Sequence, residues 1–115
     1  MQRLGFIHDM LDVKVLILFV MARVSYPVNV QQIYELCYQD DCLSYFDVCT
    51  AVPEMVKSGH LKELENENYE ITDKGRADGS LTEDSIAFTV KQRADNAVAR
   101  FNRQIRRSSF VKTQI

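Results

Sequence analysis

The chain has 115 residues, of which 46% are apolar and 26% charged, and a net charge of −2, as expected for one folded domain and not for a disordered protein. Residues 15–22 are all apolar, but this run is too short to cross a bilayer and lacks the basic flank of a signal peptide. We therefore expect a cytoplasmic protein with no membrane association.

The charges are divided unevenly along the chain. Residues 40–75 contain nine acids and three lysines, a net charge of −6, whereas residues 91–115 carry a net charge of +6. The chain thus combines an acidic middle with a basic tail.

The first helix is predicted to begin near Asp9 or Asp12 and to run to about Ser25, because an acidic residue caps or favours the positive end of a helix. It is apolar almost all round, which predicts the central, most buried helix. After the turn at residues 25–27, the extended segment from Val28 to Val30 is expected to form a short strand or a bridge.

The second helix is predicted from Val30 to about Gln39, with Asn29 as its N-cap. Ser44 opens the third helix, and Asp47 three residues later resembles a capping box. Pro53 falls inside this helix, where it removes one backbone hydrogen bond. A kink at Pro53 is favoured over two shorter helices.

A β-hairpin is predicted next, entered through Gly59 at a helix C-terminus that requires positive φ. The residues 65–68 form a polar turn of types that tolerate left-handed backbone, and Thr72 is placed to cap the following helix. The two arms carry apolar residues in alternation: Leu61, Leu64, Tyr69 and Ile71.

Two further helices complete the expected fold. One or two helical turns over residues 73–78 are predicted to end at Gly79, and a long helix is predicted from Thr82 to about Arg107. Residues 110–115 have strand character. The domain plan is therefore 1–79 for the compact part, 80–107 for the long helix and 108–115 for a tail that begins a strand.

This order of helix, extended piece, two helices, two-stranded hairpin and helix resembles a winged helix-turn-helix domain, an α+β fold that is mostly α. The sequence TDKGR, residues 72–76, directly after a strand, is similar to the exit from the wing in many bacterial winged-helix regulators. Residues 8–36 and 43–61 also resemble a small bacterial family described only as a domain of unknown function. The resemblance covers roughly residues 6–110 and implies that family members continue past this length.

The resemblance implies a DNA-binding transcriptional regulator, in which the third helix enters the major groove and the wing lies by the backbone. The residues placed for contact with double-stranded DNA are Ser44, Tyr45, Thr50, Lys57 and Lys62, with Arg76 at the wing exit.

The charges of this chain depart from the usual pattern of such regulators, in which Lys and Arg neutralise phosphates. The third helix carries Asp47 and Glu54 against Lys57, and the hairpin turn carries two glutamates and no base. The alternative is therefore a winged-helix module that binds protein and not DNA.

The last helix carries two stripes. The apolar stripe favours pairing of two subunits in a homodimer, against packing on its own domain. It comprises Val90, Ala94, Ala97, Val98, Phe101 and Ile105. The basic stripe could contact nucleic acid or an acidic partner. More commonly, a run of charges of this kind is a solvated helix face, or a face that complements the acidic middle of a dimer mate. It comprises Arg93, Arg100, Arg103 and Arg107.

Neither a cofactor nor a catalytic centre is predicted. Cys37, Cys42 and Cys49 with His60 lack the spacing of zinc ligands, and an odd number of cysteines suits a reducing compartment. No serine, histidine and aspartate arrangement for nucleophilic catalysis and no phosphate-binding glycine loop is evident. We therefore expect no metal site and no enzyme activity.

Overall fold

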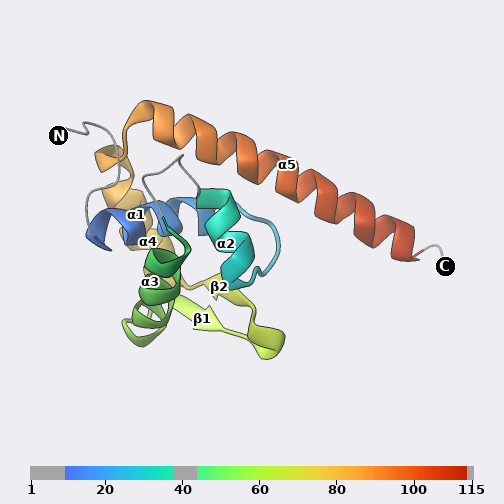
Figure 1. Ribbon diagram of the computed structural model, residues 1–115, viewed down its shortest axis with the longest axis horizontal. Helices are drawn as coiled ribbons and strands as arrows, with labels where there is room; N and C mark the ends of the chain where they lie inside the picture. The colour runs from blue at the N-terminus through green and yellow to red at the C-terminus, as the bar shows by residue number, and fades with distance from the viewer. Residues whose placement is uncertain (1–9, 38–43, 114–115) are drawn as a thin grey trace.

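The computed structural model describes residues 10–37 and 44–113, with side chains up to residue 106. It is mostly helical with one two-stranded antiparallel sheet (Figure 1), which confirms the predicted α+β class. The elements are α1 Met10–Met21, α2 Val30–Cys37, α3 Tyr45–Lys57, β1 Leu61–Glu63, the 3-10 turn η1 Glu65–Glu67, β2 Tyr69–Ile71, α4 Asp73–Thr82, the 3-10 turn η2 Glu83–Ser85 and α5 Phe88–Thr113.

Helix α1 is the centre of the core, as its apolar sequence predicts. Eight of its 12 residues are buried, and it contacts α2, α3, α4 and α5. It ends at Met21, four residues before the predicted Ser25. The Arg23 guanidinium donates to the Phe19 carbonyl oxygen at 3.1 Å and so supplies a partner for the last turn.

Both helices of the α2–α3 pair begin with reciprocal side-chain caps. The Asn29 side chain accepts from the Gln32 amide at 2.8 Å, and the Gln32 side chain accepts from the Asn29 amide at 3.0 Å. Ser44 and Asp47 form the capping box that the sequence predicts for α3. Helix α3 continues through Pro53 as one element and is not divided into two shorter helices.

The hairpin follows the prediction closely. Gly59 has φ +86°, and Asn66 and Glu67 in the turn also have positive φ. Leu61 lies opposite Ile71 in the register of the two strands, and Leu61 is buried in the core. Val28 forms an isolated antiparallel bridge with Tyr69. Of the two predicted alternatives, the α1–α2 connection therefore forms the bridge and not a strand.

The predicted boundaries after the hairpin are wrong. Helix α4 runs through Gly79 to Thr82, because Gly79 is buried against Leu18 of α1 and serves helix packing, not helix termination. Thr82 and Glu83 lead into η2, and α5 begins only at Phe88. Residues 110–113, expected to start a strand, continue α5.

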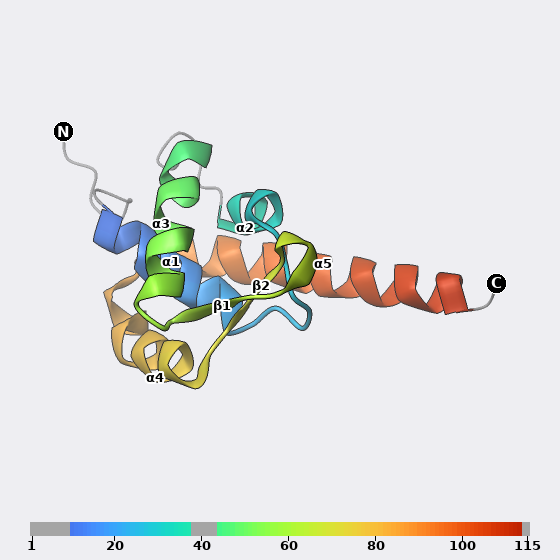
Figure 2. The same ribbon diagram turned by 90° about the horizontal axis from the view of Figure 1, so that it is seen from below.

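Helix α5 lies across α1 on the side opposite to α3 and the hairpin (Figures 1 and 2). Its first half contacts α1 and α2, and its far end extends away from the rest of the molecule. The molecule is accordingly elongated, with extents of 53 × 28 × 25 Å. Arg23 joins the end of α1 to this layer, because it pairs with Glu83 at 3.2 Å and with Asp95 at 3.3 Å.

Candidate nucleic-acid interface

The outward side of α3 is the most accessible helical face near the hairpin. Ser44, Phe46 and Lys57 are exposed and Thr50 is partly exposed, and Phe46 has 75% of its surface in solvent. The inward side, with Val48, Val52 and Met55, is buried. The sequence thus gives α3 a core face and an exposed face. Thr50 and Lys57 lie on the exposed face, and Ser44 caps the N-terminus, about 20 Å from Lys57 along the helix.

The hydroxyls of Ser44 and Thr50 can each form a further hydrogen bond besides the one they make within the helix. Ser44 Oγ accepts from the Asp47 amide at 3.1 Å, which leaves its O–H for another acceptor. Thr50 Oγ1 donates to the Phe46 carbonyl oxygen at 3.0 Å, which leaves its lone pairs. One hydroxyl can therefore donate to a ligand and the other can accept from it.

Tyr45 is held by neighbours and is less available than the sequence suggested. Its ring meets that of Tyr34 on α2 edge-on, with centroids 5.6 Å apart. A hydrogen bond with the Cys49 side chain raises the pKa of the Tyr45 hydroxyl. Tyr45 therefore joins α2 to α3, and 45% of its surface remains exposed.

Lysines lie near the C-terminal end of α3 and the base of the hairpin. Lys57 is exposed in the last turn of α3, and Lys62 is exposed on β1 opposite Glu70. Lys74, which sequence reasoning did not single out, donates to the Ser58 carbonyl oxygen at 3.0 Å. These three lysines supply positive charge beside the C-terminal end of α3.

The hairpin tip is acidic. Glu63, Glu65 and Glu67 are exposed. Burial and then the charges of Glu63 and Glu67 raise the pKa of the nearby Tyr69 hydroxyl, so a negative field extends over this end of the hairpin. A polyanion approaching α3 must avoid this tip or meet a counter-charge there.

Arg76 does not join the α3 surface. Its guanidinium donates to the Ala22 carbonyl oxygen at 3.3 Å, just after α1, and it lines a shallow hollow with Tyr26, Pro27 and Glu70. This hydrogen bond links α4 to the segment that follows α1.

The two stripes of α5 also lie away from α3. Val90, Ala94 and Val98 are buried in the core of their own chain, so this half of the apolar stripe packs on its own domain and is not free to pair subunits. Ala97 and Phe101 pack at the edge of that core, and Ile105 is half-buried. In the basic stripe Arg93, Arg100 and Arg103 are exposed, and the side chain of Arg107 lies outside the described residues.

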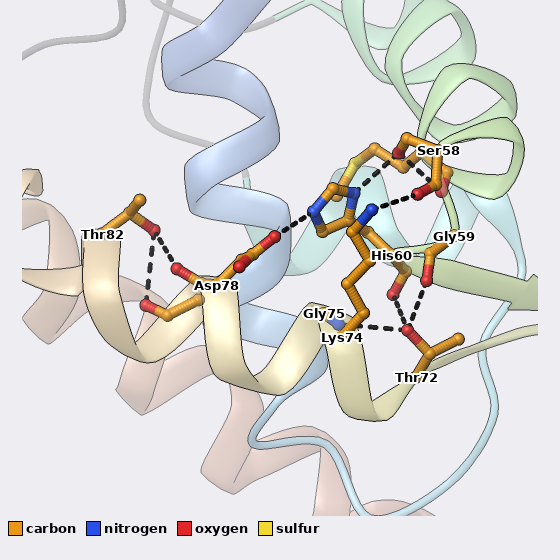
Figure 3. A network of polar contacts seen from close by, with 10 residues as sticks. Ser58, Gly59, His60, Thr72, Lys74, Gly75, Asp78 and Thr82 are labelled. Carbon is orange, nitrogen blue, oxygen red and sulfur yellow. Dashed lines mark hydrogen bonds and ion pairs between the residues drawn. The ribbon is translucent and has the colours of Figure 1, made fainter.

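A polar network fastens the hairpin to α4 (Figure 3). His60 Nε2 lies 2.5 Å from Asp78 Oδ2, and His60 Nδ1 lies 2.7 Å from Ser58 Oγ. Thr72 Oγ1 donates to the carbonyl oxygens of Gly59 and His60 and accepts from the Gly75 amide at 3.1 Å. Sequence reasoning missed this network, because Asp78 is 18 residues from His60 and only the fold brings them together.

The serine, histidine and aspartate of this network lack what acyl transfer needs. The backbone amides beside Ser58 are all committed: Ser58 to Glu54, Gly59 to Val56 and His60 to Met55 carbonyl oxygens. No donor remains there to stabilise an oxyanion. The network is therefore suited to holding the hairpin at a fixed angle to α3 and α4.

Next to this network α1, α3 and α4 enclose a mainly apolar groove of about 330 Å³. Leu11 and Leu81 at its edge are 68% and 81% exposed, and Met55 and Leu18 lie within it. Lys14 at its side is paired with Glu54 of α3 at 2.7 Å. The groove is large enough for a small ligand, but the polar groups of His60 and Asp78 on its wall are already satisfied by one another.

The described residues were also compared with the predictions for a metal site, free thiols and membrane-spanning helices. In the part of the chain that the structure describes, no three His, Cys, Asp or Glu side chains are grouped so as to hold a metal ion. Cys37 is buried, which raises the pKa of its thiol, Cys49 is partly buried, and Cys42 lies outside the described residues. No helix over the described ranges has the length and apolar character to cross a bilayer.

One protein-family model, described as Domain of unknown function (DUF4364), matches residues 13–115. No curated protein and no solved structure matches the chain significantly.

Proposed function

Since the chain belongs to this family, whose description assigns no activity, we propose from its geometry that it is a cytosolic DNA-binding regulator with a winged helix-turn-helix. In this proposal α2 and α3 form the helix-turn-helix, α3 is the recognition helix, and the β1–β2 hairpin is the wing.

The observation that carries the proposal is the exposed face of α3 beside the hairpin. Helix α3 has 13 residues, about 20 Å, and its outer side is open among the residues that the structure describes. A helix of this size fits the major groove, which is about 12 Å wide. Ser44, at the N-terminus where base contacts concentrate in such domains, and Thr50 supply the complementary donor and acceptor.

The charges around α3 set the strength of binding. Lys57, Lys62 and Lys74 are the cations available to phosphates, and each neutralised phosphate contributes about 0.9 to the slope of log affinity against log salt. We therefore expect a slope of about 2–3 for each copy of the chain, and micromolar affinity for random duplex DNA. Specific binding would depend on the hydroxyls and on the shape of the target.

The test is fluorescence anisotropy with random duplex DNA across a salt series. The Lys57→Ala/Lys62→Ala variant should reduce the salt slope by about 2. Lys91→Ala/Arg93→Ala is the matched control, because it removes the same charge from the first half of α5 on the opposite side of α1, and it should leave the slope unchanged. Absence of binding by the wild-type chain at low salt would overturn the proposal.

Protein binding is the second candidate, favoured by Phe46. An aromatic side chain that is 75% exposed suits a partner with an apolar surface, and the exposed glutamates of the hairpin suit a partner that is also basic. If this candidate is correct, Phe46→Ser weakens partner binding strongly, and the wild-type chain fails the DNA test.

A further inference from the structure

The far end of α5 extends away from the rest of the molecule (Figure 1). Asn102 is hydrogen-bonded to the Arg23 carbonyl oxygen and the Ser25 amide, and within the described residues no later residue of α5 is packed against the core. The helix nevertheless continues to Thr113, about 16 Å further. We name residues 103–113 the α5 arm. Because the arm projects from the body of its own chain, a second surface can contact it.

The α5 arm is basic throughout. It has four basic residues and no acidic one. Arg103 and Arg106 are exposed, and neither has an ion-pair partner among the described residues. On an ideal helix both point away from the buried stripe of Val90, Ala94 and Val98, so they face outward from their own body.

The matching surface is the hairpin of residues 61–71. It carries four glutamates against one lysine, all four are exposed, and the described residues provide none of them with an ion-pair partner. The hairpin of the same chain lies across α1 from α5. The counter-charge for each arm is therefore available on a second copy of the chain.

We propose that the chain forms a two-fold symmetric dimer in which the α5 arm of each copy lies along the acidic hairpin of the other. The symmetry produces two identical contacts. The dimer supports the arm helix, and it neutralises the negative field at the hairpin tip.

The test uses two charge-reversed variants and sedimentation equilibrium at low salt, without DNA. The arm variant is Arg103→Glu/Arg106→Glu/Arg107→Glu, and the hairpin variant is Glu65→Lys/Glu67→Lys/Glu70→Lys. In each variant alone, like charges meet at both contacts, so the dissociation constant of the dimer should rise at least about a hundredfold. An equimolar mixture restores opposite charges at both contacts and should form the heterodimer.

Three results would each overturn the proposal. They are a wild-type chain that is monomeric at low salt, a variant that dimerises alone as well as the wild type, and a mixture that does not associate. Circular dichroism is used to check that both variants are folded. We expect them to be, because Arg103, Arg106 and the three substituted glutamates are exposed. Because no DNA is present, the outcome is independent of the proposed regulator function.

Discussion

Gly75 is the residue with the least room in the fold. A Cβ at this position would overlap the carbonyl oxygen of His60 and lie 2.7 Å from Ile71 Cγ1. Gly75→Ala is therefore expected to reduce the free energy of unfolding by about 2–3 kcal/mol, measured by urea denaturation. Gly79→Ala is the control on the same helix: its Cβ would lie 3.3 Å from Leu18 Cβ, and better helix propensity offsets this contact, so its effect should be below about 1 kcal/mol. Equal effects of the two changes would contradict this account of Gly75.

The His60–Asp78 contact links the start of the hairpin to α4. His60→Ala and Asp78→Ala should each lower the free energy of unfolding by about 1–2 kcal/mol, because each leaves a partly buried group without its partner. The double variant should cost less than the sum, with a coupling energy of about 1 kcal/mol. A coupling energy near zero, measured in the same urea series, would mean that the 2.5 Å contact does not hold the hairpin.

Two substitutions at the N-cap of α3 separate the effect of Ser44 on helix stability from its effect on DNA binding. Ser44→Ala removes the cap and should cost about 1 kcal/mol, whereas Ser44→Asp keeps a capping acceptor and should preserve stability. In the DNA-binding proposal Ser44→Asp nevertheless weakens binding, because it places a negative charge toward the phosphates. Thermal unfolding and DNA-binding anisotropy of both variants test this prediction. If the Ser44→Asp variant binds DNA as tightly as the wild type, Ser44 does not contact DNA.

Pro53 offers a second prediction for α3. The helix is continuous through it, although proline provides no N–H for the carbonyl four residues earlier. Pro53 is exposed, so Pro53→Ala adds the missing donor without disturbing the core. The melting temperature should rise, corresponding to about 1–2 kcal/mol. A lower melting temperature would indicate that the helix requires its proline.

Local signals in the sequence predicted the first part of the fold well and the second part poorly. Ser44, Asp47, Gly59 and Thr72 act on backbone within a few residues, so their roles could be inferred from the sequence. Gly79 misled the prediction, because its small size serves contact with Leu18, 61 positions away in the chain. The network of His60 and Asp78 was missed for the same reason.

The composition of the candidate α3 surface could be predicted from the sequence, but the arrangement of the residues around it could not. The sequence identified Ser44, Thr50 and Lys57 on one helix, since helical spacing fixes which residues share a face. Whether Arg76 and the α5 arginines lie near that face depends on how α4 and α5 pack on α1. Only the tertiary structure placed them elsewhere.

The α5 arm and the body of the molecule should differ in local stability. Amide hydrogen exchange should be slow in the first half of α5, which packs on α1 and α2, and fast in residues 103–113 at low protein concentration. Raising the concentration should protect the arm and the hairpin together if each arm lies on a partner's hairpin. Protection of the arm that does not change with concentration would point to support within one chain.

The connection between α1 and α2 looks like an ordinary surface loop, but both of its ends are fixed. The Ser25 amide donates to the Asn102 side chain at 2.9 Å, and the backbone of Val28 exchanges two hydrogen bonds with Tyr69. The loop therefore cannot move or change length without breaking one of these contacts. For protein engineering this makes residues 25–28 a poor place to split the chain, insert a tag or create new termini, since a cut there would loosen the hairpin and the long helix at once.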